Sequence, residues 1–590
     1  MKTNPLQFYT KEKSSLNLEL SKLKKRLYTI SALRLFVFFS TIIGIYFSLR
    51  NGLTVSIVAF VGVVIFAILL FINSKFQIKK QLLVTKIRIN QTEISVINGS
   101  YKNLNTGSEF VNPQHCYSND IDLFGKGSFF QYSNRTATKE GTLTYANLLT
   151  ENEIEQIDEK QKAVIELSEK IRWRQHFTAI AGLVEVQFSA KSIANYIKNY
   201  RSVLPTYLVR LVNAFIVISI IIIGLVAFGL IPFSTLAVWF FLGLFFSASQ
   251  LKRTNTIYNA SGKAKETFKQ YYQLLNEIEK QRFTSKKLLE KQLEIQSEKE
   301  KASVVFQKFS RALDSFDQRN NVIIAIFGNA LFLWDIQNAL KVEKWISKYQ
   351  HTVENWFKVI AYFDAQNTLA NFHFNHPTFV FPTISSEVSI LNAIQLGHPL
   401  LKADKRVDND FVIDKEQFFI VTGANMAGKS TFLRSVSLTI VMANMGLPVC
   451  AKNIEYNPIK LITSMRTSDS LADDESYFYA ELKRLKFIVD TIENEDYFIV
   501  LDEILKGTNS KDKAIGSKKF VEKLSASNST GIIATHDVSL CELAEGSENI
   551  KNYFFSAEVK NNELFFDYFL NEGICKNMNA SFLLKKMKIL

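Results

Sequence analysis

Cysteine is scarce in this sequence, and proline and charge are unevenly placed. Four cysteines occur in 590 residues and no two form a Cys-x-x-Cys pair, which excludes a disulfide scaffold and a zinc module. No proline lies between residues 233 and 376. Residues 35–74 contain only one charge, Arg50, and residues 211–251 contain none. Because one hydrophobic core rarely exceeds roughly 250–300 residues, two or more domains are expected.

The two apolar stretches are long enough to cross a membrane twice each. Each is about 40 residues long, whereas one crossing needs roughly 20. The first is interrupted at Arg50–Gly52 and the second at Gly229–Pro232. The alternatives are buried core helices, whose apolar runs are usually shorter, and a cleaved signal peptide, which would start earlier in the chain. The pattern predicts four transmembrane helices in two hairpins, near residues 28–49, 52–73, 209–229 and 233–250.

Basic side chains flank both hairpins and are nearly missing from their tips. Residues 1–34 carry eight basic and two acidic side chains, and Lys75, Lys198 and Lys252 belong to the other basic flanks. The positive-inside rule predicts a multi-pass protein of the cytoplasmic (inner) membrane, with both termini and all large segments in the cytoplasm. The net charge of +14 suits a polyanionic partner, either nucleic acid or an anionic membrane surface.

The remaining chain separates into helical and α/β regions. Residues 151–200 and 254–345 have apolar positions at helical spacing, and the second region predicts long helices. The charged run 286–301 is interpreted as a solvated helix face, or alternatively as an arm that contacts a polyanion. From residue 377 onward, short apolar bursts such as 379–381 and 418–421 alternate with helical patterns, which is typical of an α/β domain. The expected domains are a basic N-terminus with the first hairpin at 1–90, a linker and first part of a helical core at 91–205, the second hairpin at 206–252, a long-helix region at 253–375 and an α/β domain at 376–590.

A glycine-rich motif follows the expected strand at 418–421 and precedes a helical pattern. It fits GxxxxGK[ST] and reads Gly423, Ala424, Asn425, Met426, Ala427, Gly428, Lys429, Ser430, Thr431. In such a loop the backbone amides surround a nucleotide's β-phosphate, and the following helix adds its dipole. We expect Lys429 to contact the β- and γ-phosphates and Ser430 to ligate Mg²⁺. A chance match in a glycine-rich turn is the weaker interpretation, because strand and helix are both in place.

Two other expected strands end in polar side chains. Residues 497–501 lead into Asp502 and Glu503, and residues 531–535 lead into His536. Asp502 is expected to hold Mg²⁺ through water, and Glu503 to polarise the attacking water. His536 is expected to contact the γ-phosphate or that water, with a purely structural histidine as the alternative. The predicted activity is ATP hydrolysis, with ATP and Mg²⁺ as cofactors.

These motifs resemble the ATPase domain of the MutS DNA mismatch-repair family, a branch of the ABC-type ATPases. The family's TGPNMGGKST is similar to residues 422–431, its STFMxEM to residues 476–482, and its ATH to residues 534–536. Its GRGTST keeps only the central Gly-Thr pair at 507–508, and its RHP and PND elements resemble Gly397-His398-Pro399 and Asn409-Asp410. Residues 123–138 resemble, more weakly, the opening of the family's core domain with its DRTxTPMG run. The resemblance implies a phosphate-loop ATPase domain of ABC type at the C-terminus, joined to a mainly helical core.

The resemblance also implies how two subunits would pair. Two ATPase domains would associate head to tail, so that Ser476 of one subunit reaches the γ-phosphate bound by the other. One phosphate loop per chain then requires a dimer, most simply a C2 homodimer. An ordinary helix N-cap is the alternative role for Ser476.

The family's mismatch-reading N-terminal domain, with its Phe-x-Glu wedge, has no counterpart before the first hairpin. A wedge needs a folded platform, so mismatch-specific reading is not expected. The expected function is a membrane-anchored MutS-like ATPase that binds DNA, mismatched or branched. One alternative is a membrane ATPase that acts on a protein or envelope partner. A transport ATPase is the weaker alternative, because ABC exporters carry an LSGGQ segment that this sequence lacks.

Overall fold

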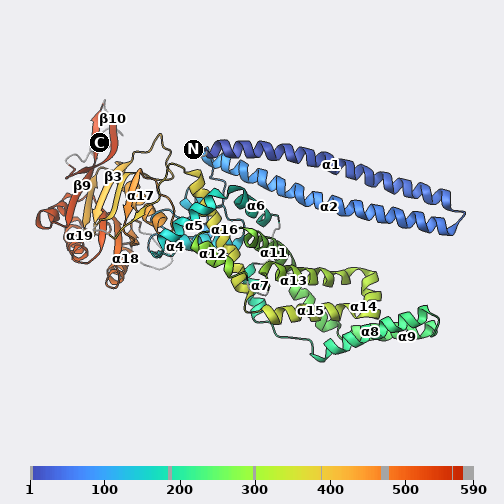
Figure 1. The fold of residues 1–590 in the computed structure, drawn as a ribbon. Helices are drawn as coiled ribbons and strands as arrows, with labels where there is room; N and C mark the ends of the chain where they lie inside the picture. Colours follow the sequence, from blue (N-terminus) through green and yellow to red (C-terminus); the bar gives the residue numbers. More distant parts are fainter. Residues whose placement is uncertain are drawn as a thin grey trace.

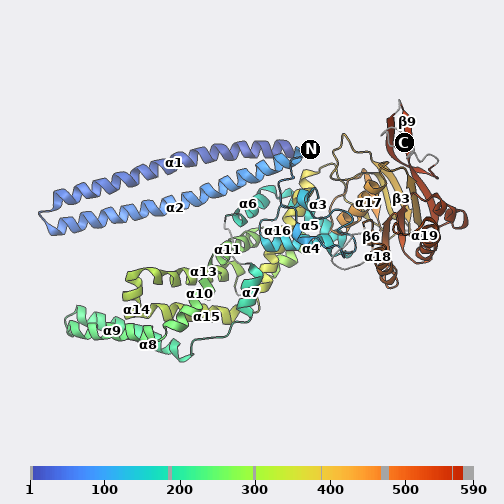
Figure 2. The same cartoon turned by 180° about the vertical axis from the view of Figure 1, so that it is seen from behind.

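The structure is a computed structural model that describes residues 4–183, 189–262, 264–296, 300–386, 389–466, 477–560 and 563–575. An α/β domain lies at one end of an elongated helical body and the second helical hairpin at the other, whereas the first hairpin leaves the body close to the α/β domain, where the N-terminus is marked (Figure 1). The view from behind shows the same order, with both hairpins directed to the same side (Figure 2).

The first hairpin consists of α1 (Pro5–Ser48) and α2 (Gly52–Ile97). The side chain of Asn4 caps α1 by accepting from the backbone of residues 6 and 7, and Pro5 occupies the first helical turn. The helices approach closely at Gly62, where an added Cβ would lie 2.3 Å from Thr41 Oγ1. The turn falls at residues 49–51 as predicted, but both helices run far beyond the predicted spans. The segments outside the spans pair through a small cluster around Leu23 and Leu83.

The second hairpin consists of α8 (Tyr207–Ala227) and α9 (Phe233–Ser249). Gly229 takes a left-handed backbone conformation, φ +71°, in the predicted turn. Between the helices, the rings of Phe215 and Trp239 stack with centroids 4.5 Å apart, and Trp239 Nε1 donates to Ser219 Oγ at 2.8 Å. The chain then bends by 60° into α10 (Leu251–Gly262).

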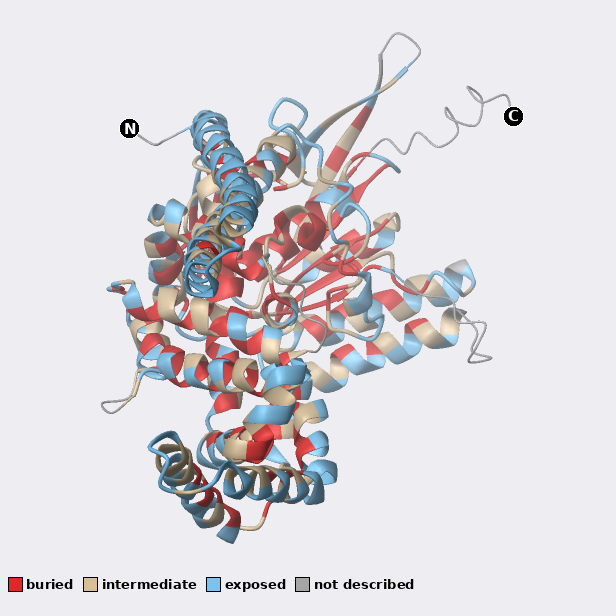
Figure 3. Cartoon of the chain, turned by 90° about the vertical axis from the view of Figure 1, so that its right-hand side faces the viewer, coloured by how far each residue is buried: buried red, intermediate tan, exposed pale blue. Residues whose placement is uncertain are grey.

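The apolar helices fit a membrane by length and composition. Helices α1, α2 and α8 are each long and apolar enough to cross, and α9 with α10 passes the same test as a bent pair. In the most apolar window of α1 and of α2, only 6% of residues are buried inside the protein. Figure 3 shows the first hairpin as largely exposed. The existence of four crossings and their orientation stay predictions.

The helical body contains shorter helices than the sequence predicted. Its helices are α3 (Phe129–Ser133), α4 (Lys139–Thr150), α5 (Ile157–Glu169), α6 (Ile171–Ala181), α7 (Ala190–Lys198), α11 (Lys265–Lys280), α12 (Lys286–Leu293), α13 (Ala302–Asp317), α14 (Asn329–Phe332), α15 (Trp334–Tyr349) and α16 (Val353–Asn375). The prediction of long helices over 254–345 is wrong, although the region is helical. Tertiary contacts bound these helices without proline. At the end of α11, Gln292 Nε2 donates to the carbonyl oxygens of Ile278 and Gln281, both at 2.7 Å. Directly before α12, the carboxylate of Glu166 accepts from the backbone N–H groups of residues 284 and 285, at 2.9 and 2.7 Å.

Helix α16 connects the helical body to the α/β domain and is buried along most of its length. Its Asp364 accepts hydrogen bonds from the backbone N–H and the hydroxyl of Thr138, at 2.8 and 2.7 Å. Thr138 in turn caps α4 by accepting from Gly141 N at 2.9 Å. Burial raises the pKa of Asp364 to about 6. Thr138, the last residue of the weak resemblance at 123–138, therefore ties α4 to α16.

A buried polar network joins the base of the first hairpin to α16. Glu93 of α2 pairs with Arg135 Nε at 2.6 Å and accepts from Asn375 Nδ2 at 2.8 Å. Tyr9 of α1 is fully buried and donates to Asn375 Oδ1 at 2.8 Å. Because buried polar groups are costly to leave unpaired, these contacts hold the hairpin firmly on the body.

The α/β domain contains two sheets. Its strands are β1 (Thr383–Ile384), β2 (Ser389–Leu396), β3 (Asn409–Asp414), β4 (Phe418–Gly423), β5 (Asn453–Tyr456), β6 (Lys460–Ser464), β7 (Tyr497–Asp502), β8 (Thr530–Ala534), β9 (Ile550–Lys560) and β10 (Glu563–Glu572). The order β1-β5-β2-β3 forms one sheet and β10-β9-β4-β8-β7-β6 the other, parallel except for β10. The strands predicted after residue 417 are confirmed. The burst at 379–381 is not a strand, because Val380 makes only one isolated bridge, to Val449.

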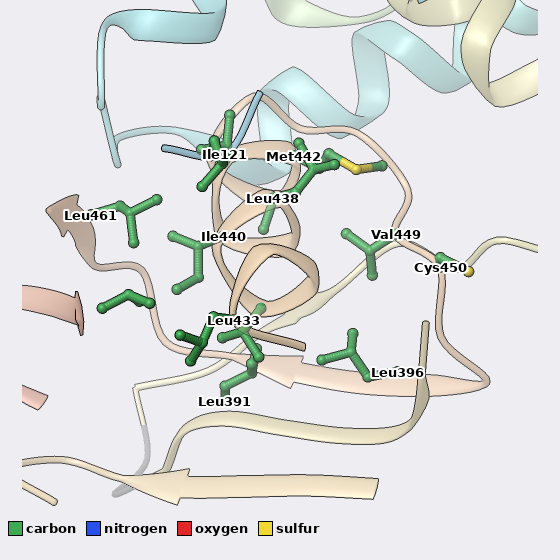
Figure 4. Close-up of a cluster of buried hydrophobic side chains, with 14 of the residues drawn as sticks. Ile121, Leu391, Leu396, Leu433, Leu438, Ile440, Met442, Val449, Cys450 and Leu461 are labelled. Carbon is green, nitrogen blue, oxygen red and sulfur yellow. The ribbon is translucent and has the colours of Figure 1, made fainter. Parts of the chain in front are cut away.

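Helix α17 (Lys429–Asn444) follows β4 and forms the centre of the largest core cluster. Figure 4 shows Leu433 and Ile440 of α17 among side chains from β2, from residues 449–450 and from Ile121 of the helical body. The segment around Ile121 therefore shares one hydrophobic core with the α/β domain, although it lies far upstream of the predicted domain boundary at residue 376.

Candidate nucleotide-binding site

The three polar motifs predicted from sequence lie at one edge of the six-stranded sheet. Strand β8 lies between β4 and β7, and its Ala534 is in register with both Val421 and Asp502. The carboxyl ends of these parallel strands therefore meet, which is where α/β sheets usually bind ligands. The loop after β4, the acidic pair after β7 and His536 after β8 surround the same point.

The loop between β4 and α17 has a backbone that needs glycine. Gly423 and Gly428 have φ +149° and +108°, and an added Cβ on Gly423 would lie 2.8 Å from Phe555 O. Met426 also has a positive φ, +68°, and its side chain is exposed. A cavity of about 430 Å³ adjoins the loop and is lined by Ala424, Asn425, Met426, Gly428, Lys429, Ser430 and Thr431, and by Glu503. Of the predicted loop residues, Gly423 and the buried Ala427 do not line it.

The side chain of Lys429 is held inside the loop. Its Nζ donates to Gly423 O at 2.7 Å and Ala424 O at 3.1 Å, and lies 3.4 Å from His536 Nε2. Burial lowers the pKa of Lys429, whereas the charges of Asp502 and Glu503 act to raise it. The ammonium group is thus positioned beside the amides that would surround a phosphate.

Ser430 and Asp502 form the oxygen pair that was predicted to bind a metal. Ser430 Oγ donates to Asp502 Oδ2 at 2.7 Å. Burial raises the pKa of Asp502, and the hydrogen bond from Ser430 opposes this rise. A hydroxyl beside a carboxylate provides the hard oxygen donors that Mg²⁺ prefers, so this pair fits the ion.

Glu503 and His536 contact each other directly. Glu503 Oε1 lies 2.7 Å from His536 Nε2, and Glu503 Oε2 lies 3.4 Å from Lys506 Nζ. The hydrogen bond with His536 is the main reason why the pKa of Glu503 falls to about 2. Glu503 also has φ +52°, a costly backbone conformation that clusters at functional sites. The sequence predicted separate roles for the two side chains, and the structure joins them by one direct hydrogen bond.

Ser476 lies outside the described residues, but the helix that follows it reaches the site. In α18 (Tyr477–Ile492), the buried carboxylate of Glu481 accepts from Lys506 N at 3.0 Å. It thereby holds the turn that follows Glu503. Sequence reasoning did not assign Glu481 to the site, although it stands in the segment that resembles STFMxEM.

A second group of contacts that the sequence did not reveal joins the helical body to the end of β6. Asp120 accepts from Thr463 Oγ1 at 2.5 Å and from Arg466 N at 3.0 Å. Arg484 of α18 donates to Thr463 O at 2.7 Å and to Cys116 O at 2.5 Å. Movement of α18 would therefore change its hydrogen bonds to the segment around residues 116–120.

The elements resembling RHP and PND build the other wall of the cavity. His398 lines it, and burial lowers the pKa of this imidazole to about 4. Asn409 donates to Tyr568 O at 3.1 Å and accepts from Leu570 N at 2.7 Å. These bonds hold Tyr568 close to Gly428.

The sheet, the glycine-rich loop and the polar side chains at its edge define a candidate nucleotide-binding domain. Residues 419–586 match the family model described as MutS domain V. The chain is 32% identical over 189 residues to the DNA mismatch repair protein MSH4 of Arabidopsis thaliana, covering 31% of this chain and 23% of the relative. It is 33% identical over 218 residues to the DNA mismatch repair protein MutS of Methanococcoides burtonii, covering 35% and 24%. A MutS of Staphylococcus aureus is 26% identical over 272 residues, covering 44% and 30%.

These matches support a relationship to the MutS family, whose members are ATPases that use ATP with Mg²⁺. The chain matches at most 30% of the length of these relatives. The family model places the relationship in the C-terminal part of the chain, at residues 419–586.

Proposed function

We propose that this protein is a membrane-anchored ATPase of MutS type that binds and hydrolyses ATP and acts on DNA. The observation that carries the proposal is the meeting of Lys429, the Ser430–Asp502 pair and the Glu503–His536 pair at one sheet edge. A backbone cradle, a buried ammonium, a pair of metal-binding oxygens and a carboxylate are the parts that phosphoryl transfer to water needs. The match of the same region to MutS domain V supports it.

Each residue then has a definite task. The amides of 424–428 and Lys429 Nζ would bind the β- and γ-phosphates, and Ser430 with Asp502 would hold Mg²⁺. The ion would supply charge neutralisation at the phosphate oxygens. Glu503 stays ionised at neutral pH, because its pKa lies near 2, and would accept a hydrogen bond from the attacking water and polarise it. His536 would keep that carboxylate oriented through their hydrogen bond, and it also contacts the ammonium group of Lys429.

We propose a C2 homodimer in which two such domains face each other across ATP. The cavity is open on the side of Met426, whose side chain is 77% exposed in the single chain. The relatives are DNA mismatch repair proteins, and on that basis we propose duplex DNA, mismatched or branched, as the partner, with little preference for mismatches.

Membrane anchoring is proposed from the two hairpins. Their exposed apolar surfaces, such as Phe47 at 78% and Phe245 at 78%, would be unfavourable in water. Lysines and arginines flank the hairpins, which favours a cytoplasmic ATPase domain in a multi-pass inner-membrane protein. The same hairpins favour a second candidate function, an ATPase that uses this motor on a protein or envelope partner.

The test is an ATPase assay of the full chain in lipid nanodiscs, with and without homoduplex, single-mismatch and branched DNA. We expect hydrolysis that DNA stimulates, binding that weakens steeply with salt, and less than about tenfold preference for a mismatch, or 1.4 kcal/mol. Hydrolysis without any DNA binding at low salt would favour the second candidate function. No hydrolysis under any condition would contradict both.

A further inference from the structure

A third apolar element lies beside the second hairpin. From Asn320 to Trp334 the chain has fifteen consecutive uncharged residues, between Arg319 and Asp335. This segment contains the π-helix η3 (Ile324–Gly328) and α14. It connects α13 to α15 at the end of the helical body that is far from the α/β domain (Figure 1). An apolar run of this length is too short to cross a bilayer, and it usually belongs either to a core or to a re-entrant element.

The first half of the segment is not part of the protein core, whereas Ala330 and Leu333 in its second half are buried. Val322 is 71% exposed, Ile323 68%, Phe327 54% and Ile326 42%. Four large apolar side chains close together on one short helical turn form a surface that water solvates poorly.

Contacts with α9 fix the position of this surface. An added Cβ on Gly243 would lie 2.0 Å from Ala330 O, so the two backbones touch. Ser247 Oγ donates to Asn329 Oδ1 at 2.9 Å, and the rings of Phe240 and Phe327 pack edge to face with centroids 5.6 Å apart. These α9 residues run from the middle of the helix to its C-terminal half. If α9 lies in a bilayer, the segment lies at the same depth.

Both ends of the segment return to one place. Arg319 Nη2 lies 2.9 Å from Asp335 Oδ2, and both side chains are largely buried. The guanidinium also lies over the ring of Tyr258, 5.0 Å from its centroid. The chain therefore enters and leaves on the same side, and the charges at its two ends neutralise each other.

We propose that residues 320–334 form a re-entrant membrane element, whose exposed apolar side chains lie in the hydrocarbon of the inner leaflet beside α9. This inference rests on the proposed membrane anchoring and extends it, because the segment that connects α13 to α15 would itself lie in lipid. Its backbone suits this environment, since η3 and α14 hydrogen-bond within the segment and α9 covers one side.

The test is site-specific fluorescence of the full chain in nanodiscs. The four native cysteines are replaced by serine, and ATP binding by this background checks its fold. Single cysteines at positions 323, 327, 241 and 344 then carry an environment-sensitive label. Phe241 is an exposed apolar residue of α9 and serves as the positive control. Lys344 is an exposed residue of α15, the helix that follows the segment, but it is charged, and it serves as the negative control. Each label is measured with and without lipids that carry quenchers on their acyl chains.

We expect labels at 323 and 327 to be quenched as strongly as the label at 241, while the label at 344 is unaffected. Quenching at 241 with none at 323 and 327 would overturn the re-entrant element and leave the anchoring intact. Blue-shifted but unquenched emission at 323 would also overturn it, because a protein surface would then cover the segment. No quenching at 241 would contradict the anchoring itself and, with it, this inference.

Discussion

The carboxylate of Glu503 and the imidazole of His536 are joined at the ends of neighbouring strands, with 2.7 Å between Oε1 and Nε2. The same Nε2 lies 3.4 Å from Lys429 Nζ. One chain of contacts therefore connects the predicted phosphate-binding cation to the predicted water-activating acid. A substitution at one member therefore removes a contact of the next.

Replacing Glu503 by glutamine should separate binding from turnover. The amide keeps the size of the side chain but accepts a proton poorly, so hydrolysis should fall by roughly 10²-fold or more while ATP still binds. Phosphate release and nucleotide binding measure the two effects, and mass photometry should show an ATP-trapped dimer. Glu548→Gln, at an exposed position outside the site, is the control. Turnover at the parental rate would exclude Glu503 as the base.

Replacing Lys429 by alanine should abolish tight nucleotide binding. The substitution removes the buried ammonium beside the loop carbonyls, and we expect the Kd for ATP to rise at least about tenfold, or 1.4 kcal/mol. Lys415→Ala is a matched control, because Lys415 pairs only with Asp496 at the surface among the contacts described. Equal affinities of the two variants would contradict the assignment of the phosphate loop.

The hydrogen bonds of the Glu503 carboxylate should stabilise the fold in a pH-dependent way. The pKa of Glu503 is lowered from 4.5 to about 2, so the unfolded chain binds more protons in this range. The stabilisation is therefore complete above pH 4.5 and is lost as the pH falls toward 2, with a size of about 3 kcal/mol at most. Thermal melts should show a constant difference between parent and Glu503→Gln from pH 7 to 5, and a shrinking one below. A difference that grows on acidification would refute this assignment.

Glu481 should act by holding the turn after Glu503. Glu481→Ala leaves Lys506 N without its acceptor, which costs roughly 1–3 kcal/mol, and it should lower kcat more than it changes KM. Glu481→Gln keeps an acceptor oxygen and should retain more of the parental kcat. If both variants match the parent in kcat, the turn does not depend on this carboxylate.

Cysteine labelling of intact cells tests the topology. In a background without the native cysteines, a cysteine at position 51 or 232 should react with a membrane-impermeant thiol reagent, because each lies at a hairpin tip. A cysteine at position 191 should react only after lysis. Labelling at 191 in intact cells would contradict four crossings with a cytoplasmic body.

The site could be anticipated from the sequence where function depends on fixed local spacing. The motif at residues 423–431 joins a strand to a helix, Asp502 ends an apolar strand and His536 follows another, so their common edge follows from parallel pairing. Asp120 and Arg484 could not be found this way. Asp120 reaches Arg466 across 346 residues of sequence, and no local pattern records such a contact.

The helical half was predicted less well for a physical reason. The lack of proline and the helical spacing of apolar residues favour long helices. Neither feature reveals where a side chain from another part of the chain hydrogen-bonds to the backbone. Gln292 binds the carbonyl oxygens of Ile278 and Gln281 at the end of α11 in this way. The lengths of α1 and α2 were also underestimated. The turns of both helices beside the helical body are polar, so they do not contribute to the apolar runs from which the spans were predicted.

The two hairpins extend from one body in the same direction, and the polar network around Glu93 fixes the first of them to that body. This geometry restricts how two copies can associate. A two-fold axis lying in the membrane plane would invert one copy and put its hairpins on the wrong side. Only an axis along the membrane normal keeps both sets of anchors in one bilayer. Any duplex held by such a pair would then be confined to the layer of cytoplasm next to the membrane.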